Sequence, residues 1–379
     1  MIVQIETAVL LSALFFAIFP PANSEFATLP VIDLGPWIHK AGAHGQDSCS
    51  VVQQQTLVDD ILQACRTIGF FLVTNHGVDP KIIQEAWDVA ANFFDLPGSE
   101  KMQYKTTNET EYPYGYEQQE QLIKGKALDG SDTGIDDGTP LEESKETLAI
   151  GPDNPASDMP LRRWISTPNL PHNFQSALES YYQEMENLAL QLLELFALAL
   201  GQPINYFEDK MDHHLSALRL IHYYPLPKRE DEKSKLIIRA GAHTDYGALT
   251  ILNAAQPGLQ VLRYDSGNRS RAEWYSVPVV PGALVINLGD LMQRWTNDEW
   301  VSTLHRVVMS TSDSGAGSEA QRRYSMAFFV NVNGDTMIEA LTTDKNDERK
   351  YPPISARDHL MAKHLASMGL LDNNHDDEL

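Results

Sequence analysis

The chain has 379 residues, of which 42% are hydrophobic and 21% charged, a composition typical of an ordinary soluble globular protein with one or two domains. Its 52 acidic residues outnumber its 29 basic ones and give a formal net charge of -23. This charge argues against a nucleic-acid or anionic-membrane partner, because phosphates need a Lys/Arg surface to displace their counterions. We therefore expect a small molecule or a protein as the partner.

The first 24 residues have most features of a signal peptide. Residues 8–19 form a 12-residue apolar run, AVLLSALFFAIF, which is too short to span a bilayer and suits the core of a secretory leader. Residues 22–24, Ala-Asn-Ser, then offer a small-x-small cleavage site. The preceding MIVQIE lacks the Lys or Arg that a secretory leader usually carries. We expect residues 1–24 to be removed and the mature protein to have no stable membrane association.

The chain stops with Asp376-Asp377-Glu378-Leu379, which is close to the KDEL and HDEL retention signals. Acidic tails are common, so this end alone is a weak indication. Together with the leader it favours the lumen of the endoplasmic reticulum. The alternative is a cytoplasmic protein.

The first third of the chain alternates strand and helix patterns. Residues 29–38, LPVIDLGPWI, read as a short strand closed by Gly-Pro, and residues 69–77, GFFLVTNHG, as a second strand. Apolar residues at spacings of three and four predict helices over 55–67 and 81–95. This part is therefore expected to be an α/β segment.

The middle of the chain changes composition twice. Residues 104–172 are rich in Gly, Pro, Asp and Glu with little periodicity, which predicts a long loop region with short elements; a solvated insertion is the alternative. A strong apolar stripe then predicts a helix over 173–200, and Gly201 is expected to end it.

From 215 to 331 short runs of β-formers are separated by turn residues, which predicts an all-β sandwich or barrel. Ser355 and Asp358 have the spacing of a capping box, which predicts a helix over 355–368. The expected segments are a signal peptide (1–24), an N-terminal α/β domain with its long loop region (29–172), a long helix with the β core (173–335), and a C-terminal helix with an acidic tail (336–379).

One possible metal site stands out in the β region. In RAGAHTDYGALTIL, His243 and Asp245 lie two positions apart at a strand end, so both side chains point the same way. His305 in STLHRVVM can supply a third ligand from another strand. Two histidines and one carboxylate form the facial triad of non-haem Fe(II) oxygenases. The alternative is a hydrogen-bonded core cluster. His375 and Asp377 have the same spacing but lack a third ligand nearby.

A carboxylate-binding pair follows on a later strand. In QRRYSMAFFV, Arg323 and Ser325 alternate onto one face and are suited to receive a carboxylate through a guanidinium fork and a hydroxyl. Tyr224, before a strand-ending proline, can add a phenol hydrogen bond. Such a group would hold the far end of a 2-oxo acid that chelates iron. The alternatives are a structural salt bridge for the pair and an ordinary core tyrosine.

These motifs together resemble the iron(II)/2-oxoglutarate-dependent dioxygenase family of the isopenicillin N synthase type. The shared motifs are HTD at 243, STLHRV at 302, RYS at 323, HYYP at 222, INLGD at 286, WTND at 295, and the early segments LPVIDL, GFFLVTNHGV and GYEQQ. The resemblance covers roughly residues 29–365. The family's usual Asn beside the tyrosine pair is His222 here, which puts the role of that position in doubt.

The resemblance implies a mixed α+β fold, with a double-stranded β-helix core (a cupin-like jelly roll) flanked by helices and preceded by an N-terminal α/β segment. It also implies that His243, Asp245 and His305 bind Fe(II), and that Arg323, Ser325 and Tyr224 hold the C5 carboxylate of 2-oxoglutarate. The expected co-substrates are 2-oxoglutarate and O2, with ascorbate as a candidate reductant.

The implied reaction hydroxylates, desaturates or oxidatively cyclises a small molecule of specialised metabolism, coupled to conversion of 2-oxoglutarate to succinate and CO2. A monomer is expected. Candidate substrate contacts are Tyr246, Phe329, Tyr114, Tyr116 and Arg239. Two alternatives remain: an iron oxidase of the same fold that does not use 2-oxoglutarate, and a catalytically silent jelly-roll binding protein.

Overall fold

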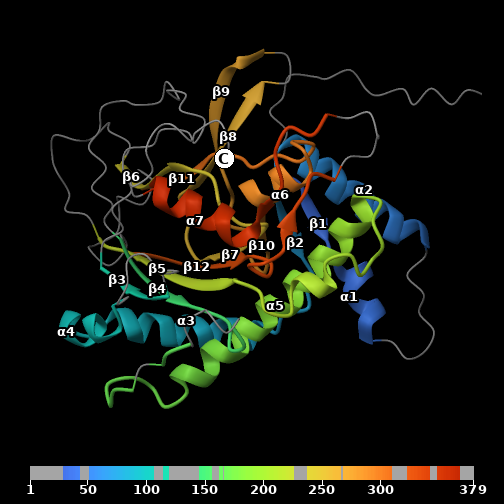
Figure 1. The fold of residues 1–379 in the computed structure, drawn as a ribbon. Coiled ribbons are helices and arrows are strands. Elements are labelled where there is room, and N and C mark those ends of the chain that lie inside the picture. The colour runs from blue at the N-terminus through green and yellow to red at the C-terminus, as the bar shows by residue number, and fades with distance from the viewer. Residues whose placement is uncertain are drawn as a thin grey trace, which may run out of the picture.

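Two β-sheets packed face to face form the centre of the computed structural model (Figure 1). The structure describes residues 29–42, 51–105, 114–118, 145–155, 162–164, 166–225, 237–265, 268–309, 322–341 and 348–367. Apart from the parallel pair β1 and β2, the strands of both sheets are antiparallel. Facing antiparallel sheets are the arrangement of a jelly roll, as the family resemblance implied.

The major sheet has eight strands and the minor sheet has four. The order in the major sheet is β1 (Val31–Asp33), β2 (Phe70–Thr74), β10 (Leu284–Leu288), β7 (Leu249–Ala254), β12 (Arg323–Val330), β5 (Ala217–Tyr223), β4 (Lys145–Ile150) and β3 (Gly115–Glu117). The order in the minor sheet is β6 (Ile237–His243), β11 (His305–Met309), β8 (Leu259–Asp265) and β9 (Asn268–Ser276). Strands from the N-terminal third thus extend the major sheet at both edges.

The two faces of the major sheet have different partners because strand side chains alternate. Leu220 and Phe328 point to the outer face and join the large core formed with the helices. Tyr223 and Val285 point to the inner face and pack against the minor sheet. Figure 1 shows the long helix α5 (Phe174–Ala199) and helix α3 (Pro80–Phe94) running along the outer side of the strands. The inner face is therefore where a site between the sheets must lie.

The helices predicted over 55–67, 81–95, 173–200 and 355–368 are present close to those ranges. The helices of the structure are α1 (Gly35–Gly42), α2 (Val51–Thr67), α3 (Pro80–Phe94), α4 (Gly98–Lys101), α5 (Phe174–Ala199), α6 (Asp290–Trp295) and α7 (Ala356–Ser367), with 3-10 turns η1 (Met102–Tyr104) and η2 (Glu208–Lys210) and a two-strand pair β13 (Met337–Ile338) and β14 (Ile354–Ser355). Gly201 follows α5 with φ +67°, the left-handed conformation that ends helices at glycine. Helices α1, α4 and α6 were not predicted. At α1, Gly-Pro closes β1 and also starts the helix, where proline fits the first turn.

A buried ionic network lies on the outer face of the major sheet. The Glu146 carboxylate accepts hydrogen bonds from Lys101 Nζ (2.7 Å) and Tyr116 OH (2.5 Å) and is bonded to His222 Nδ1 (2.7 Å). Burial alone would raise the pKa of Glu146, but these partners outweigh it and lower the pKa from its ordinary 4.5 to about 2. The network ties strands β3, β4 and β5 to helix α4.

Glu146→Gln is expected to destabilise the fold by about 3–5 kcal/mol, because it leaves the buried Lys101 ammonium without its counter-charge. Since the folded pKa of Glu146 lies below 4.5, its contribution is present above about pH 4.5 and is lost as the pH falls toward 2. Urea unfolding should therefore show a gap between wild type and variant that narrows below pH 4.5. A gap that is independent of pH would contradict the assignment.

Among the described residues, none of the helices combines the length and apolar character that a membrane span requires. The predicted signal peptide and the acidic tail lie outside the described residues.

Candidate metal centre and carboxylate-binding site

His243, Asp245 and His305 come together on the inner side of the minor sheet, with one ligand atom from each within 4.8 Å of the others. His305 Nε2 lies 3.6 Å and His243 Nε2 lies 3.9 Å from Asp245 Oδ1. Neighbouring ligands of one ion, at bond lengths of about 2.1 Å, are about 3 Å apart. The three atoms thus surround a space that one ion fits after a small inward adjustment.

Strand pairing brings the two histidines together. His243 is the last residue of β6 and His305 the first of β11, and the antiparallel register pairs them directly. Directly paired residues point to the same side of a sheet, and the two ring centroids lie 4.3 Å apart. Phe70 of the major sheet meets His305 edge to face at 5.3 Å and closes one side of the centre.

Hydrogen bonds from Nδ1 to the backbone leave Nε2 of each imidazole available to bind a metal. Nδ1 of His243 donates to Gly241 O (2.8 Å) and Nδ1 of His305 donates to Thr303 O (3.1 Å). A proton on Nδ1 leaves a lone pair on Nε2, the tautomer that metal ligation needs. Burial, and then the nearby His243, lower the pKa of His305 to about 4, so this ring is neutral at physiological pH.

Asp245 is held as an anion with one oxygen toward the histidines. Its Oδ2 accepts hydrogen bonds from Thr250 Oγ1 (2.5 Å) and Asn287 Nδ2 (2.6 Å). Burial would raise the pKa of Asp245, but His305, His243 and these two donors outweigh burial and lower the pKa. Two imidazoles and one oriented carboxylate make a donor set that suits Fe(II).

A buried arginine stands on the inner face of the major sheet. The Arg323 guanidinium donates from Nε to Pro257 O (3.2 Å) and from Nη1 to Ser325 Oγ (3.4 Å), and is 5% exposed. Burial lowers its pKa, yet a guanidinium remains charged in proteins. In the part of the chain that the structure describes, no carboxylate pairs with this cation. A buried cation of this kind is suited to receive an anionic ligand.

Tyr223, and not Tyr224, is the tyrosine beside this arginine, which corrects the prediction. Tyr223 pairs with Arg323 across β5 and β12, and the guanidinium carbon lies 4.9 Å from its ring centroid. Tyr224 follows the end of β5, lies 5.2 Å from the His222 ring and bonds to Glu146. The alternation along LRLIHY places Arg219, Tyr223 and the residue between them at 221 on one face, and this signal could have identified Tyr223 from the sequence.

Phe329 lies near the metal centre. It pairs with Thr250 across β12 and β7, and Thr250 donates to Asp245. Phe329 therefore shares the inner face with Arg323, as the sequence predicted from alternation. Arg219, which the sequence analysis did not single out, places its guanidinium carbon 5.8 Å from the Phe329 ring centroid. Ser325 pairs with Ile221 of β5, and Arg219 lies two residues before Ile221. The same alternation along β5 therefore predicts that Arg219 points to the inner face.

Tyr116 is not in the site. It is 1% exposed on the outer face, where its hydroxyl donates to Glu146 and its ring meets Phe93 at 5.9 Å. The prediction of a substrate contact is therefore wrong for Tyr116. Tyr114 lies against Gly151, and its hydroxyl is 3.5 Å from Leu215 O at the start of β5.

Two further candidate substrate contacts lie on or after strand β6: Arg239 is within the strand, and Tyr246 follows the candidate ligand Asp245. Arg239 is 2% exposed within β6, and its Nη2 lies 3.7 Å from Met309 Sδ. Tyr246 follows Asp245 and is half-buried; its carbonyl accepts a hydrogen bond from His359 Nε2 (3.2 Å).

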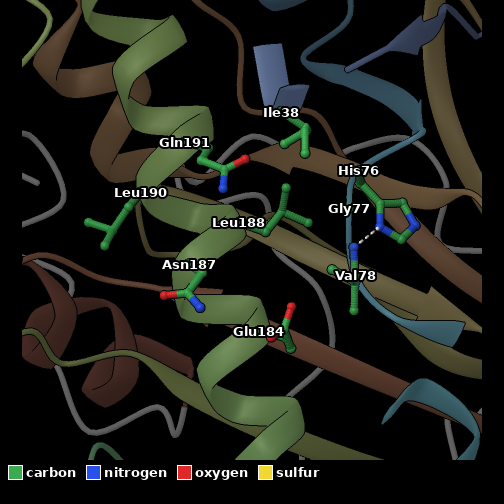
Figure 2. Close-up of a pocket in the computed structure, with 9 residues that line it drawn as sticks. All are labelled: Ile38, His76, Gly77, Val78, Glu184, Asn187, Leu188, Leu190 and Gln191. Carbon is green, nitrogen blue, oxygen red and sulfur yellow. Dashed lines mark hydrogen bonds between the residues drawn. The ribbon is translucent and has the colours of Figure 1, made fainter. Parts of the chain in front are cut away.

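A separate hollow of about 260 Å³ lies away from the metal centre, between α1, α5 and the segment after β2 (Figure 2). His76 lines it, but both ring nitrogens are engaged: Nδ1 accepts from Val78 N (3.3 Å) and Nε2 donates to Gly282 O (3.1 Å). His76 therefore has a structural role here.

Two family models match the chain. Residues 29–171 match the model described as "non-haem dioxygenase in morphine synthesis N-terminal", and residues 215–332 match the 2OG-Fe(II) oxygenase superfamily. The second range includes the three candidate metal ligands, Arg323 and Ser325.

Curated relatives cover almost the whole chain. The 2-oxoglutarate-Fe(II) type oxidoreductase hxnY of Emericella nidulans is 31% identical over 90% of this chain and 90% of its own length. The homoarginine-6-hydroxylase 2-ODD-233 of Oryza sativa is 32% identical over 91% of this chain and 99% of its own length.

Solved structures share the fold. Full-length Neurospora crassa T7H, in complex with α-ketoglutarate and 5-formyluracil, has a TM-score of 0.72 and 26% identity over 91% of this chain and 98% of its own. A 2OG-Fe(II) oxygenase family protein of Caulobacter crescentus has a TM-score of 0.68 and 25% identity, covering 88% of this chain and 97% of its own.

Proposed function

This chain belongs to the 2-oxoglutarate- and Fe(II)-dependent oxygenase superfamily, and from that premise we propose the residues that carry its reaction. Its activity is that of a dioxygenase that couples decarboxylation of 2-oxoglutarate to oxidation of a second substrate. His243, Asp245 and His305 would hold Fe(II), and Arg323, Ser325 and Tyr223 would hold the distal carboxylate of 2-oxoglutarate.

The observation that carries this proposal is the pairing of two preorganised sites on facing sheets. The donor set of the triad is fixed by backbone acceptors on both histidines and by Thr250 and Asn287 on the carboxylate. When bound, Fe(II) with 2-oxoglutarate supplies the chemistry that reduces O2, releases CO2 and succinate, and oxidises the substrate. The protein's part is to fix each ligand's protonation state and direction, so that little reorganisation is needed.

The carboxylate anchor orients 2-oxoglutarate relative to the metal. Arg323 and Ser325 are two residues apart on β12, so both reach the same inner-face ligand. Phe329 lies further along the same face, beside the hydrogen-bond partner of Asp245. A dicarboxylate held at Arg323 thus extends along β12 toward the triad. A guanidinium fork fixes its direction as well as its charge.

We place the second substrate next to Phe329 and Arg219. An aromatic ring beside the triad favours a planar or apolar part, and the adjacent guanidinium favours an acceptor or anionic group. Relatives are consistent with small molecules: T7H has been solved with thymine, and others are named homoarginine-6-hydroxylase and clavatol oxidase. We propose a small organic substrate of specialised metabolism, with hydroxylation as the default outcome.

A substrate screen that reads succinate and product mass tests this function. The expected result is succinate release that requires O2 and 2-oxoglutarate and rises with one class of small polar molecule. Product formation without 2-oxoglutarate would instead indicate an iron oxidase of the same fold. A protein that neither binds Fe(II) nor changes its absorption when 2-oxoglutarate is added without O2 would be a silent binding protein.

Tyr223→Phe and Tyr224→Phe separate the two neighbouring tyrosines. Loss of the Tyr223 hydroxyl should weaken 2-oxoglutarate binding roughly tenfold or more, because hydrogen bonds to charged groups contribute about 1.5–3 kcal/mol. Tyr224→Phe should leave that affinity unchanged, since Tyr224 contacts the Glu146 network on the opposite face. Titration of 2-oxoglutarate into the anaerobic Fe(II) protein measures both. The reverse ranking would restore the original assignment of Tyr224.

A further inference from the structure

The C-terminal helix α7 packs against the turn that carries two of the three candidate metal ligands. His359 Nε2 donates to Tyr246 O at 3.2 Å, directly after Asp245. Lys363, one turn further along α7, places its Nζ 3.2 Å from Asp290 Oδ2 at the start of α6. Figure 1 shows α7 lying across the core next to α6. Two polar side chains of α7 therefore reach toward the 243–247 turn.

Asp290 passes the contact from Lys363 to the ligand turn. Its Oδ2, the atom nearest Lys363, also accepts a hydrogen bond from Thr244 Oγ1 at 3.0 Å. Its backbone N–H donates to Asp245 O at 2.7 Å. Thr244 lies between His243 and Asp245, so Asp290 holds both the residue between the ligands and the backbone of the carboxylate ligand.

These contacts are buried from water, so each polar group depends on its protein partner staying within hydrogen-bond distance. The side chains of Lys363 and Asp290 are 8% and 13% exposed, and His359 is 1% exposed. Among the described residues, His359 Nδ1 has no hydrogen-bond partner, so the bond to Tyr246 O is the polar contact that orients this ring. A buried ammonium is stable only when its partner stays in place. Lys363 therefore fixes the position of Asp290.

We propose that Lys363 and His359 of α7 are positioning residues for the metal centre. They hold the 244–246 turn from outside the jelly roll, through Asp290 and the Tyr246 carbonyl, so that Asp245 meets the two histidines. This inference rests on the proposed Fe(II) site. Helix α7 would thus affect metal binding and activity although none of its residues is a proposed ligand. Partners outside the first ligand set typically change metal affinity or activity by about 10- to 100-fold.

The test compares Lys363→Met with Lys101→Met by Mn(II) binding, followed through the loss of the free-ion electron paramagnetic resonance signal. Both changes remove a buried ammonium from a carboxylate partner, but Lys101 pairs with Glu146 on the outer face. Both variants should lose stability. Only Lys363→Met should weaken Mn(II) binding, by about tenfold or more. Lys363→Arg, which keeps the charge, should recover most of the affinity.

Thr244→Val supplies a second arm that does not remove a buried charge. It cuts the bond to Asp290 at the turn itself, so it should weaken Mn(II) binding and add little to the defect of Lys363→Met. If Lys363→Met does not fold, Thr244→Val and Lys363→Arg decide the question. Wild-type Mn(II) affinity in Lys363→Met or Thr244→Val would overturn the proposal. Failure of the wild-type protein to bind Mn(II) would instead overturn the Fe(II) site.

Discussion

Asp245→Ala is expected to abolish turnover and to reduce metal affinity by more than about 100-fold. Even partners outside the first ligand set typically change affinity by 10- to 100-fold, and Asp245 is a proposed ligand. The change removes the anionic donor and leaves the two imidazoles, whose Nδ1 atoms donate to backbone carbonyls. Mn(II) titration and product formation measure the two effects.

The fold should survive this change, because Thr250 and Asn287 lie on the paired strands β7 and β10, whose backbone pairing does not involve the Asp245 carboxylate. The donors Thr250 and Asn287 lose their acceptor, which costs about 1–3 kcal/mol for each unsatisfied group. Asp377→Ala is the matched control, since His375 and Asp377 repeat the His-x-Asp spacing in the tail. Retained turnover in Asp245→Ala would remove the metal assignment.

Arg323→Ala should weaken 2-oxoglutarate binding by at least about 30-fold, since truncating one partner of a buried charged pair costs about 2–5 kcal/mol. The guanidinium is buried and contacts Tyr223, Ser325 and Pro257, so its loss leaves the carboxylate without this cation. Mn(II) affinity measured without 2-oxoglutarate should stay unchanged. This contrast separates the anchor from the metal centre.

Arg323→Lys is the informative control. A lysine keeps the charge but cannot form the planar two-pronged contact, so partial recovery is expected. The Arg-x-Ser pair alone does not identify the anion, because a guanidinium fork and a hydroxyl can bind any carboxylate of suitable size. If 2-oxoglutarate affinity were equal in wild type and Arg323→Ala, the carboxylate anchor would have to be sought elsewhere.

Local signals in the sequence were enough for most elements and for the residue types of the site. The stripe over 173–200 predicted α5, and the capping pattern near 355 predicted α7. The runs between 215 and 331 predicted most core strands. These signals depend on periodicity and caps within one element, which the sequence displays directly. The triad was found because His-x-Asp lies at one strand end and a third histidine lies on a later strand.

The tertiary structure decided which side chains point to the same face of the sheet and come into contact. Strand register placed Tyr223 opposite Arg323 and turned Tyr224 toward Glu146, although the two tyrosines are adjacent in the chain. Register also buried Tyr116 on the outer face. A shift of one residue moves every side chain to the other face of a sheet, and this register is fixed by pairing between distant segments. The sequence by itself thus determined the chemistry available, and long-range pairing determined which of those groups meet.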